Sequence, residues 1–181
     1  VLTPDRCFTL GAEGILACTS MADGKLLWKK ELQKEFTLPE SFFGVGCSPI
    51  LDADQLIVMV GGQPNSGVVA FDVETGDIRW QAVGKDTWDG VQTDQGGKMH
   101  KWADDEMVVS YSSPIIAEIH GQKHLLCLMR QGLVSLNPRS GAENFHYWFR
   151  PKVHESVNAA RPVVIGNRIF VSAAYLTGSA L

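Results

Sequence analysis

The chain of 181 residues carries 16 Lys and Arg against 20 Asp and Glu, and 45% of its residues are hydrophobic. A formal net charge of −4 leaves no basic surplus, which argues against binding to nucleic acid by phosphate neutralisation. No apolar run approaches the roughly 20 residues that a membrane-spanning helix needs. The composition therefore fits a globular protein without a transmembrane segment.

The apolar residues fall in short runs that Gly, Asn, Asp and Pro separate. In chain order, clear examples lie at residues 56–60, 68–71, 125–129 and 168–172. Such runs are typical of β-strands joined by tight turns, and no window has the 3.6-residue period of a helix. The sequence predicts an all-β chain.

These predicted strands recur as a repeat. The sequence at 48–51 (Ser-Pro-Ile-Leu) returns at 113–116 as Ser-Pro-Ile-Ile, and residues 161–164 form a weaker third copy. In the first two copies the proline is followed 27 positions later by a glycine. The same order of strands and turns between these anchors indicates a repeated structural unit.

Each unit also carries a glycine turn followed by an aromatic residue. The aromatic residue lies four positions after the turn glycine in three units, and the pairs are Gly24 and Trp28, Gly76 and Trp80, Gly141 and Phe145. Glycine can adopt the positive φ that such a turn requires, and a large aromatic side chain can fill the space between neighbouring units. We expect these six residues to be structural.

The repeat of strands and turns predicts a β-propeller of four-stranded antiparallel blades as the fold class. We expect one partial propeller over residues 1–181, with blade segments at about 5–40, 41–83, 109–153 and 154–181. Residues 84–108 interrupt the repeat as an insertion loop. Three to four blades cannot close a ring of the usual size, so we expect a segment of a larger propeller of seven or eight blades.

Residues 70–80 (Ala-Phe-Asp-Val-Glu-Thr-Gly-Asp-Ile-Arg-Trp) resemble the tryptophan-docking motif A-x-D-x-x-T-G-x-x-x-W of the pyrroloquinoline-quinone-like (PQQ-like) repeat. This repeat builds quinoprotein alcohol dehydrogenases and the propeller of an outer-membrane assembly lipoprotein. Two other units match the motif with substitutions. The resemblance covers nearly the whole chain outside 84–108, and it implies that Trp28, Trp80 and Phe145 dock against adjacent blades.

The resemblance implies a periplasmic or cell-envelope location, and for the dehydrogenases it implies PQQ and calcium in the central channel. No catalytic constellation of that kind can be placed in this sequence. The carboxylates of the insertion lack the D-x-D-x-D-G spacing of a calcium loop, and the five histidines lack zinc-ligand spacing. We expect no metal site and no catalytic residue within the chain.

One pair of cysteines invites a specific prediction. If residues 11–14 form a four-residue hairpin loop, Cys7 lies opposite Cys18, at a separation compatible with a disulfide. The alternative is that the two cysteines are small buried residues in the core between blades.

The approaches to the predicted inner strands are the first place to look for a ligand. In propellers these approaches surround the mouth of the central channel, and here they carry hydrogen-bonding side chains at Tyr111, Ser112, Asn158 and Arg161. The same side chains could instead bond to one another and to the turns that lead into the strands.

The insertion is polar and acidic, yet it contains Trp88 and Trp102. A purely solvated loop has no need of two large apolar side chains. They indicate that the insertion packs on the propeller face or binds a partner there, since long insertions on a rigid scaffold often carry function.

We therefore expect a non-catalytic scaffold or binding propeller that presents its channel mouth and insertion to a protein partner or a small ligand. The alternative is part of a PQQ-dependent alcohol or sugar dehydrogenase whose catalytic residues lie outside this segment.

Overall fold

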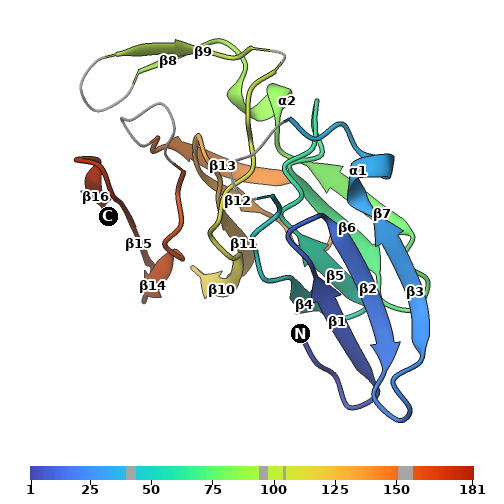
Figure 1. Cartoon of the computed structure of the whole chain (residues 1–181). Helices are drawn as coiled ribbons and strands as arrows, with labels where there is room; N and C mark the ends of the chain where they lie inside the picture. Colours follow the sequence, from blue (N-terminus) through green and yellow to red (C-terminus); the bar gives the residue numbers. More distant parts are fainter. Residues whose placement is uncertain (40–43, 94–97, 104, 151–156) are drawn as a thin grey trace.

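The structure is a computed structural model that describes residues 1–39, 44–93, 98–103, 105–150 and 157–181. Within these residues the chain forms four successive antiparallel sheets and one separate hairpin. The sheets follow one another in sequence order from the N-terminus to the C-terminus, as blades of a β-propeller do (Figure 1).

The second and third sheets are complete four-stranded blades, with each strand paired to the next in sequence. The second sheet contains β4 (Ile50–Asp52), β5 (Gln55–Val58), β6 (Val68–Asp72) and β7 (Ile78–Ala82), and the third contains β10 (Ile115–Ile119), β11 (Gln122–Leu128), β12 (Gly132–Leu136) and β13 (Glu143–Trp148). The predicted all-β fold and repeat are confirmed.

The first and last sheets each have three strands. They contain β1 (Arg6–Leu10), β2 (Ile15–Ser20) and β3 (Leu26–Glu31), and β14 (Val163–Ile165), β15 (Arg168–Ala173) and β16 (Gly178–Ala180). On the free edge of β1, Leu2 forms an antiparallel bridge with Cys7, and the Phe8 N–H donates to the Val1 carbonyl at 2.8 Å. The first residues thus occupy part of the inner-strand position of the first blade.

The remaining elements are short. Helix α1 (Leu32–Glu35) follows the first sheet, and the insertion contains α2 (Lys85–Trp88) and a hairpin of β8 (Val91–Thr93) and β9 (Met99–Lys101). The insertion that the sequence predicts as a loop therefore has secondary structure of its own. No helix among the described residues is long and apolar enough to cross a membrane.

The middle strands of the second and third sheets form the core because both of their faces are covered by neighbouring sheets. Strands β5 and β12 are buried along their whole lengths, whereas the outer strand β13 is largely exposed. One apolar cluster joins the first three sheets, and a second joins the third and fourth. Sheet-on-sheet burial explains the continuous apolar runs of the sequence.

Two indole rings connect successive sheets. A β-carbon added to Gly76 would lie 3.0 Å from the ring of Trp28, and one added to Gly141 would lie 2.5 Å from the ring of Trp80. The Trp28 Nε1–H also donates to the Val73 carbonyl of the second sheet at 3.1 Å. Each tryptophan of an outer strand thus lies on the turn glycine of the next sheet.

The turn that receives each indole is shaped by an Asp or Asn side chain. Asp72 Oδ1 accepts from the backbone N–H groups of Glu74 (2.7 Å) and Thr75 (3.0 Å). Asn137 Oδ1 repeats this arrangement in the third sheet by accepting from Arg139 at 2.8 Å. These bonds fix the turn that brings the glycine under the ring.

Phe145 is the third aromatic residue that the resemblance implies to dock on an adjacent blade. Its side chain is 39% exposed, and its ring lies 6.1 Å from that of His124 in the same sheet. Its docking on an adjacent blade stays a prediction.

The predicted disulfide between Cys7 and Cys18 is wrong. Cys7 pairs with Thr19, and Cys18 pairs with Phe8. The loop is one residue longer than predicted, because Leu10 pairs with Leu16 and not with Ile15; within the loop, Gly14 has φ +74° and its N–H donates to the Gly11 carbonyl at 2.9 Å. A shift of one residue places the two cysteines on opposite faces of the sheet, and both are free thiols.

The docking of Trp80 can be tested with a matched pair of glycine substitutions. Gly141 and Gly24 both have φ +71° in equivalent turns, but a β-carbon on Gly24 meets nothing within 4 Å. Both Gly141→Ala and Gly24→Ala introduce backbone strain of about 1 kcal/mol. We expect Gly141→Ala to cost about 1–3 kcal/mol more through steric conflict with the indole, as measured by urea unfolding. Equal losses would contradict the docking.

The thiol assignments predict a graded reactivity. Burial raises the pKa of Cys47 to about 11 and raises that of Cys127 further, whereas Cys7 is only half-buried. Because the thiolate is the reactive form, a brief maleimide treatment of the native protein should label Cys7 before Cys47 or Cys127. Mass spectrometry should find four labels after unfolding without reductant; a pair that reacts only after reduction would restore the disulfide.

Candidate binding site on the insertion face

Three approach segments, residues 44–48, 110–113 and 157–161, lead into the first strands of the second, third and fourth sheets. They lie at the same end of the sheets as the insertion and the turns β5–β6 and β11–β12. We call this end the insertion face. The turns that join β4 to β5, β6 to β7, β10 to β11 and β12 to β13 lie at the other end of the sheets. We call that end the opposite face.

Most of the polar groups predicted for the channel mouth hold the approach segments together. Asn158 is fully buried, and its Nδ2 donates to the carbonyls of Met129 (2.7 Å) and Phe149 (3.0 Å). Its carbonyl accepts from the Tyr111 N–H at 3.1 Å and from the Ser110 hydroxyl. Asn158 therefore ties the approach of the fourth sheet to the third sheet.

The other three predicted residues have different surroundings. Ser112 is fully buried, and its N–H donates to the Ser110 hydroxyl at 3.3 Å. Tyr111 is half-buried and lies on Gly46, where a β-carbon would come within 2.5 Å of its ring. Arg161 is exposed. The structure does not bring the four residues into one ligand pocket; burial makes Ser112 and Asn158 structural.

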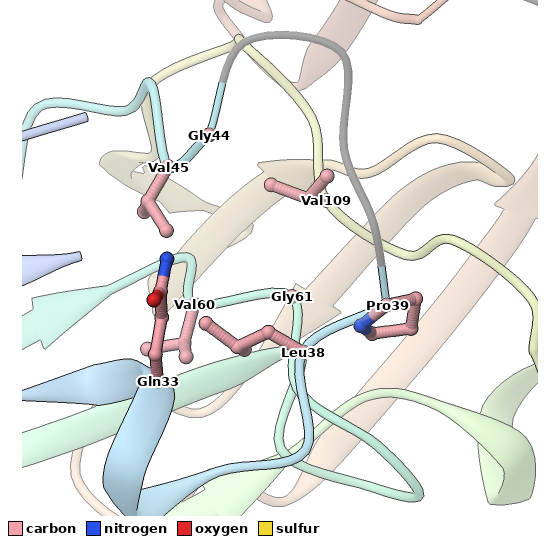
Figure 2. A pocket seen from close by; sticks show the side chains of 8 residues that line it. All are labelled: Gln33, Leu38, Pro39, Gly44, Val45, Val60, Gly61 and Val109. Carbon is pink, nitrogen blue, oxygen red and sulfur yellow. The ribbon is translucent and has the colours of Figure 1, made fainter. Parts of the chain in front are cut away.

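A separate cavity opens on the same face between the first and second sheets (Figure 2). It has a volume of about 510 Å³, and its lining is formed by Gln33, Leu38, Pro39, Gly44, Val45, Val60, Gly61 and Val109. None of these side chains is charged, and the amide of Gln33 is the single polar side chain among them. The cavity suits an uncharged group.

Most of this cavity cannot be predicted from the sequence because its residues lie far apart in the chain. Two glycines are sterically required there. A β-carbon on Gly44 would lie 2.0 Å from the Ala12 carbonyl oxygen, and one on Gly61 would lie 2.6 Å from Val109 Cβ. The signal available in the sequence was glycine at 44, ahead of the second predicted unit, and glycine at 61, in the glycine-rich stretch 61–67.

The tryptophans of the insertion are buried in this chain. Trp88 is 1% exposed, and its ring lies 5.9 Å from that of Trp148 and 5.1 Å from that of His146. Trp102 is also buried and belongs to the main core. The insertion therefore packs on the propeller, and the alternative that Trp88 and Trp102 bind a partner directly is corrected.

A buried charge cluster fastens the insertion to the third sheet. Glu106 Oε1 accepts from Arg130 at 2.9 Å and from Arg150 at 2.8 Å, and Glu106 Oε2 lies 3.1 Å from His100 Nε2. The side chains of Glu106, Arg130 and Arg150 are 8%, 6% and 12% exposed. Burial lowers the pKa of the Arg130 guanidinium.

The backbone beside Glu106 makes two further connections. The Gln63 amide of the β5–β6 turn donates to the Glu106 carbonyl, and Gln131 Nε2 of the β11–β12 turn donates to the Met107 carbonyl at 3.0 Å. Residues 106 and 107 thus bridge the loops of the second and third sheets. The insertion is a fixed part of the insertion face rather than a detached loop.

The sequence profile described as outer membrane protein assembly factor BamB matches residues 1–178. The chain belongs to this family. It is a member of the PQQ-like repeat superfamily. No curated protein matches the chain in sequence.

Solved structures agree with the fold assignment. BamB from Moraxella catarrhalis is similar, with a TM-score of 0.63 and 16% identity, over 98% of this chain and 48% of that protein. The chain thus spans about half the length of that structure. A europium-containing methanol dehydrogenase (16% identity, TM-score 0.38) and the quinohemoprotein alcohol dehydrogenase of Comamonas testosteroni (15%, 0.40) are more distant. They cover 91% and 83% of this chain, and the chain covers 44% and 35% of them.

Within the described part of the chain, no group of three or more His, Cys, Asp and Glu side chains could hold a metal ion. Among the polar side chains of the approach segments, Asn158 is bonded to carbonyls of the third sheet and Ser110 to the Asn158 carbonyl.

Glu106 offers a direct test of how the insertion is held. Glu106→Gln removes the anion that Arg130 and Arg150 share, which leaves two buried cations without it. We expect a loss of about 3 kcal/mol in unfolding free energy, measured with urea. Glu143→Gln is the control, because the contact of Glu143 with His146 is about one-third exposed and should be worth less than about 1 kcal/mol. Similar losses for both variants would argue against the cluster.

Proposed function

We propose that the chain forms the partner-binding part of a non-catalytic scaffold propeller in the cell envelope, and that the insertion face is its binding surface. Membership of a family described as outer membrane protein assembly factor supports a protein partner over a substrate. The location follows from the same family. Because the chain spans about half of the BamB structure, this proposal concerns its contribution to a larger protein.

The observation that carries the proposal is that the polar side chains of the insertion face are buried, whereas apolar side chains and a cavity are accessible. The buried polar side chains of the approach segments hold the sheets together, so they are not available for catalysis. What the same face leaves accessible is an uncharged cavity and a hairpin with exposed apolar side chains at Val91 and Met99. Exposed apolar groups on a rigid scaffold are typical of protein-binding surfaces.

Site-specific photocrosslinking in the native envelope tests this proposal. A crosslinking residue at Gln33 or Met99 of the full-length protein reports on the insertion face. The same residue at the exposed Gln122, the first residue of β11, reports on the opposite face. We expect crosslinks to proteins of outer membrane assembly that are several-fold stronger from positions 33 and 99 than from position 122.

The dehydrogenase alternative is tested in parallel. The full-length protein is given PQQ and Ca²⁺, and dye reduction is measured with simple alcohols and sugars. Quinone binding with turnover would overturn the scaffold proposal, as would crosslinks of equal strength from both faces.

A further inference from the structure

His100 lies at the centre of β9, on the side of the hairpin that meets the third sheet. It pairs with Gln92 of β8, and because strand side chains alternate, His100 and Gln92 share one face while Val91 and Met99 share the other. The imidazole lies 5.4 Å from the Trp148 ring. Val91 and Met99 are 53% and 68% exposed. The hairpin thus docks through His100 and displays Val91 and Met99 outward, together with Lys101 on the same face.

His100 Nε2 has an obligate donor and an obligate acceptor beside it. It lies 2.9 Å from an Arg150 guanidinium nitrogen, which can only donate, and 3.1 Å from Glu106 Oε2, which as a carboxylate can only accept. In the neutral ring with its proton on Nδ1, Nε2 accepts from Arg150. Protonation of Nε2 would replace this bond with one to Glu106 and would bring the charged ring against the Arg150 guanidinium.

The charges that face His100 come from three elements packed against it. Glu106 follows the insertion hairpin, Arg130 lies in the β11–β12 turn, and Arg150 follows β13. On its own element, Lys98 and Lys101 are exposed to solvent. Among these described groups near the ring, two buried cations share one buried anion. A charged His100 would add a third cation to that set.

We propose that His100 is a proton-sensitive positioning residue, which holds the β8–β9 hairpin on the third sheet when neutral and releases it when protonated. This inference goes beyond the proposed function, because it concerns how the insertion is held and not what binds it. An isolated two-stranded hairpin is only marginally stable in water. Its docking contacts therefore decide its position.

The direction of the pH effect follows from linkage. Burial, and secondly the Arg150 charge, lower the pKa of His100 below its ordinary value, while Glu106 acts in the other sense. In the released hairpin the ring regains the ordinary value of about 6.5. Since the docked pKa is the lower one, docking is complete above about pH 6.5 and is lost as the pH falls through the docked pKa.

Hydrogen exchange of the full-length protein tests the proposal. Protection factors, corrected for intrinsic exchange, are followed for the peptide that carries β8 and β9 between pH 7.5 and pH 5. We expect protection to fall several-fold on acidification, up to about tenfold for each pKa unit that separates docked from released His100. Protection of β11 and β12 in the same samples should not change.

Three variants isolate the proton on His100. His100→Gln keeps a neutral acceptor and should abolish the pH dependence, whereas His100→Arg should lower hairpin protection at every pH. His146→Gln is the matched control, because His146 contacts Trp88 but lies outside the charge cluster, and it should retain the wild-type response.

A wild-type hairpin whose protection does not change with pH would overturn the proposal, as would a response that persists in His100→Gln. If β11 and β12 lose protection in His100→Arg, that variant has lost its fold. The comparison of wild type with His100→Gln then decides.

Discussion

The contact of an outer-strand indole with the turn glycine of the next sheet is the constraint on which this structure depends. A single sheet has two apolar faces, and it becomes stable only when neighbours cover both. Trp28 and Trp80 set the spacing and rotation at which that cover occurs, because each ring fits only where the next turn has no β-carbon. The buried middle strands β5 and β12 are the result.

Sheets that are fixed in this way bring their approach segments together on the insertion face. The polar groups gathered there are connected to backbone carbonyls of adjacent sheets, as the bonds of Asn158 show. These bonds hold the centre of the face together, and the insertion is fastened beside it. The insertion in turn depends on one carboxylate, Glu106, shared between two arginines of the third sheet. The residues that hold the insertion in place and the surface proposed to bind a partner thus lie in the same small region of the insertion face.

Several features could be predicted from the sequence because they depend on local spacing. The strand runs, the glycine turns and the Trp28 and Trp80 positions recur at fixed intervals, and each repeat contacts mainly its neighbours. Errors arose where one residue of register matters. The Cys7–Cys18 pairing failed because the loop between β1 and β2 is one residue longer than predicted, which turns the two thiols to opposite faces.

By itself, the sequence determined the blade repeat, the all-β class and the family, since all three are written in short-range patterns of apolar, glycine and aromatic residues. Only the tertiary structure decided what the insertion does with Trp88 and Trp102, which residues line the uncharged cavity, and that Glu106 joins Arg130 and Arg150. The physical reason is that burial and charge pairing depend on which distant segments the packed sheets bring into contact. No spacing along the chain records that arrangement.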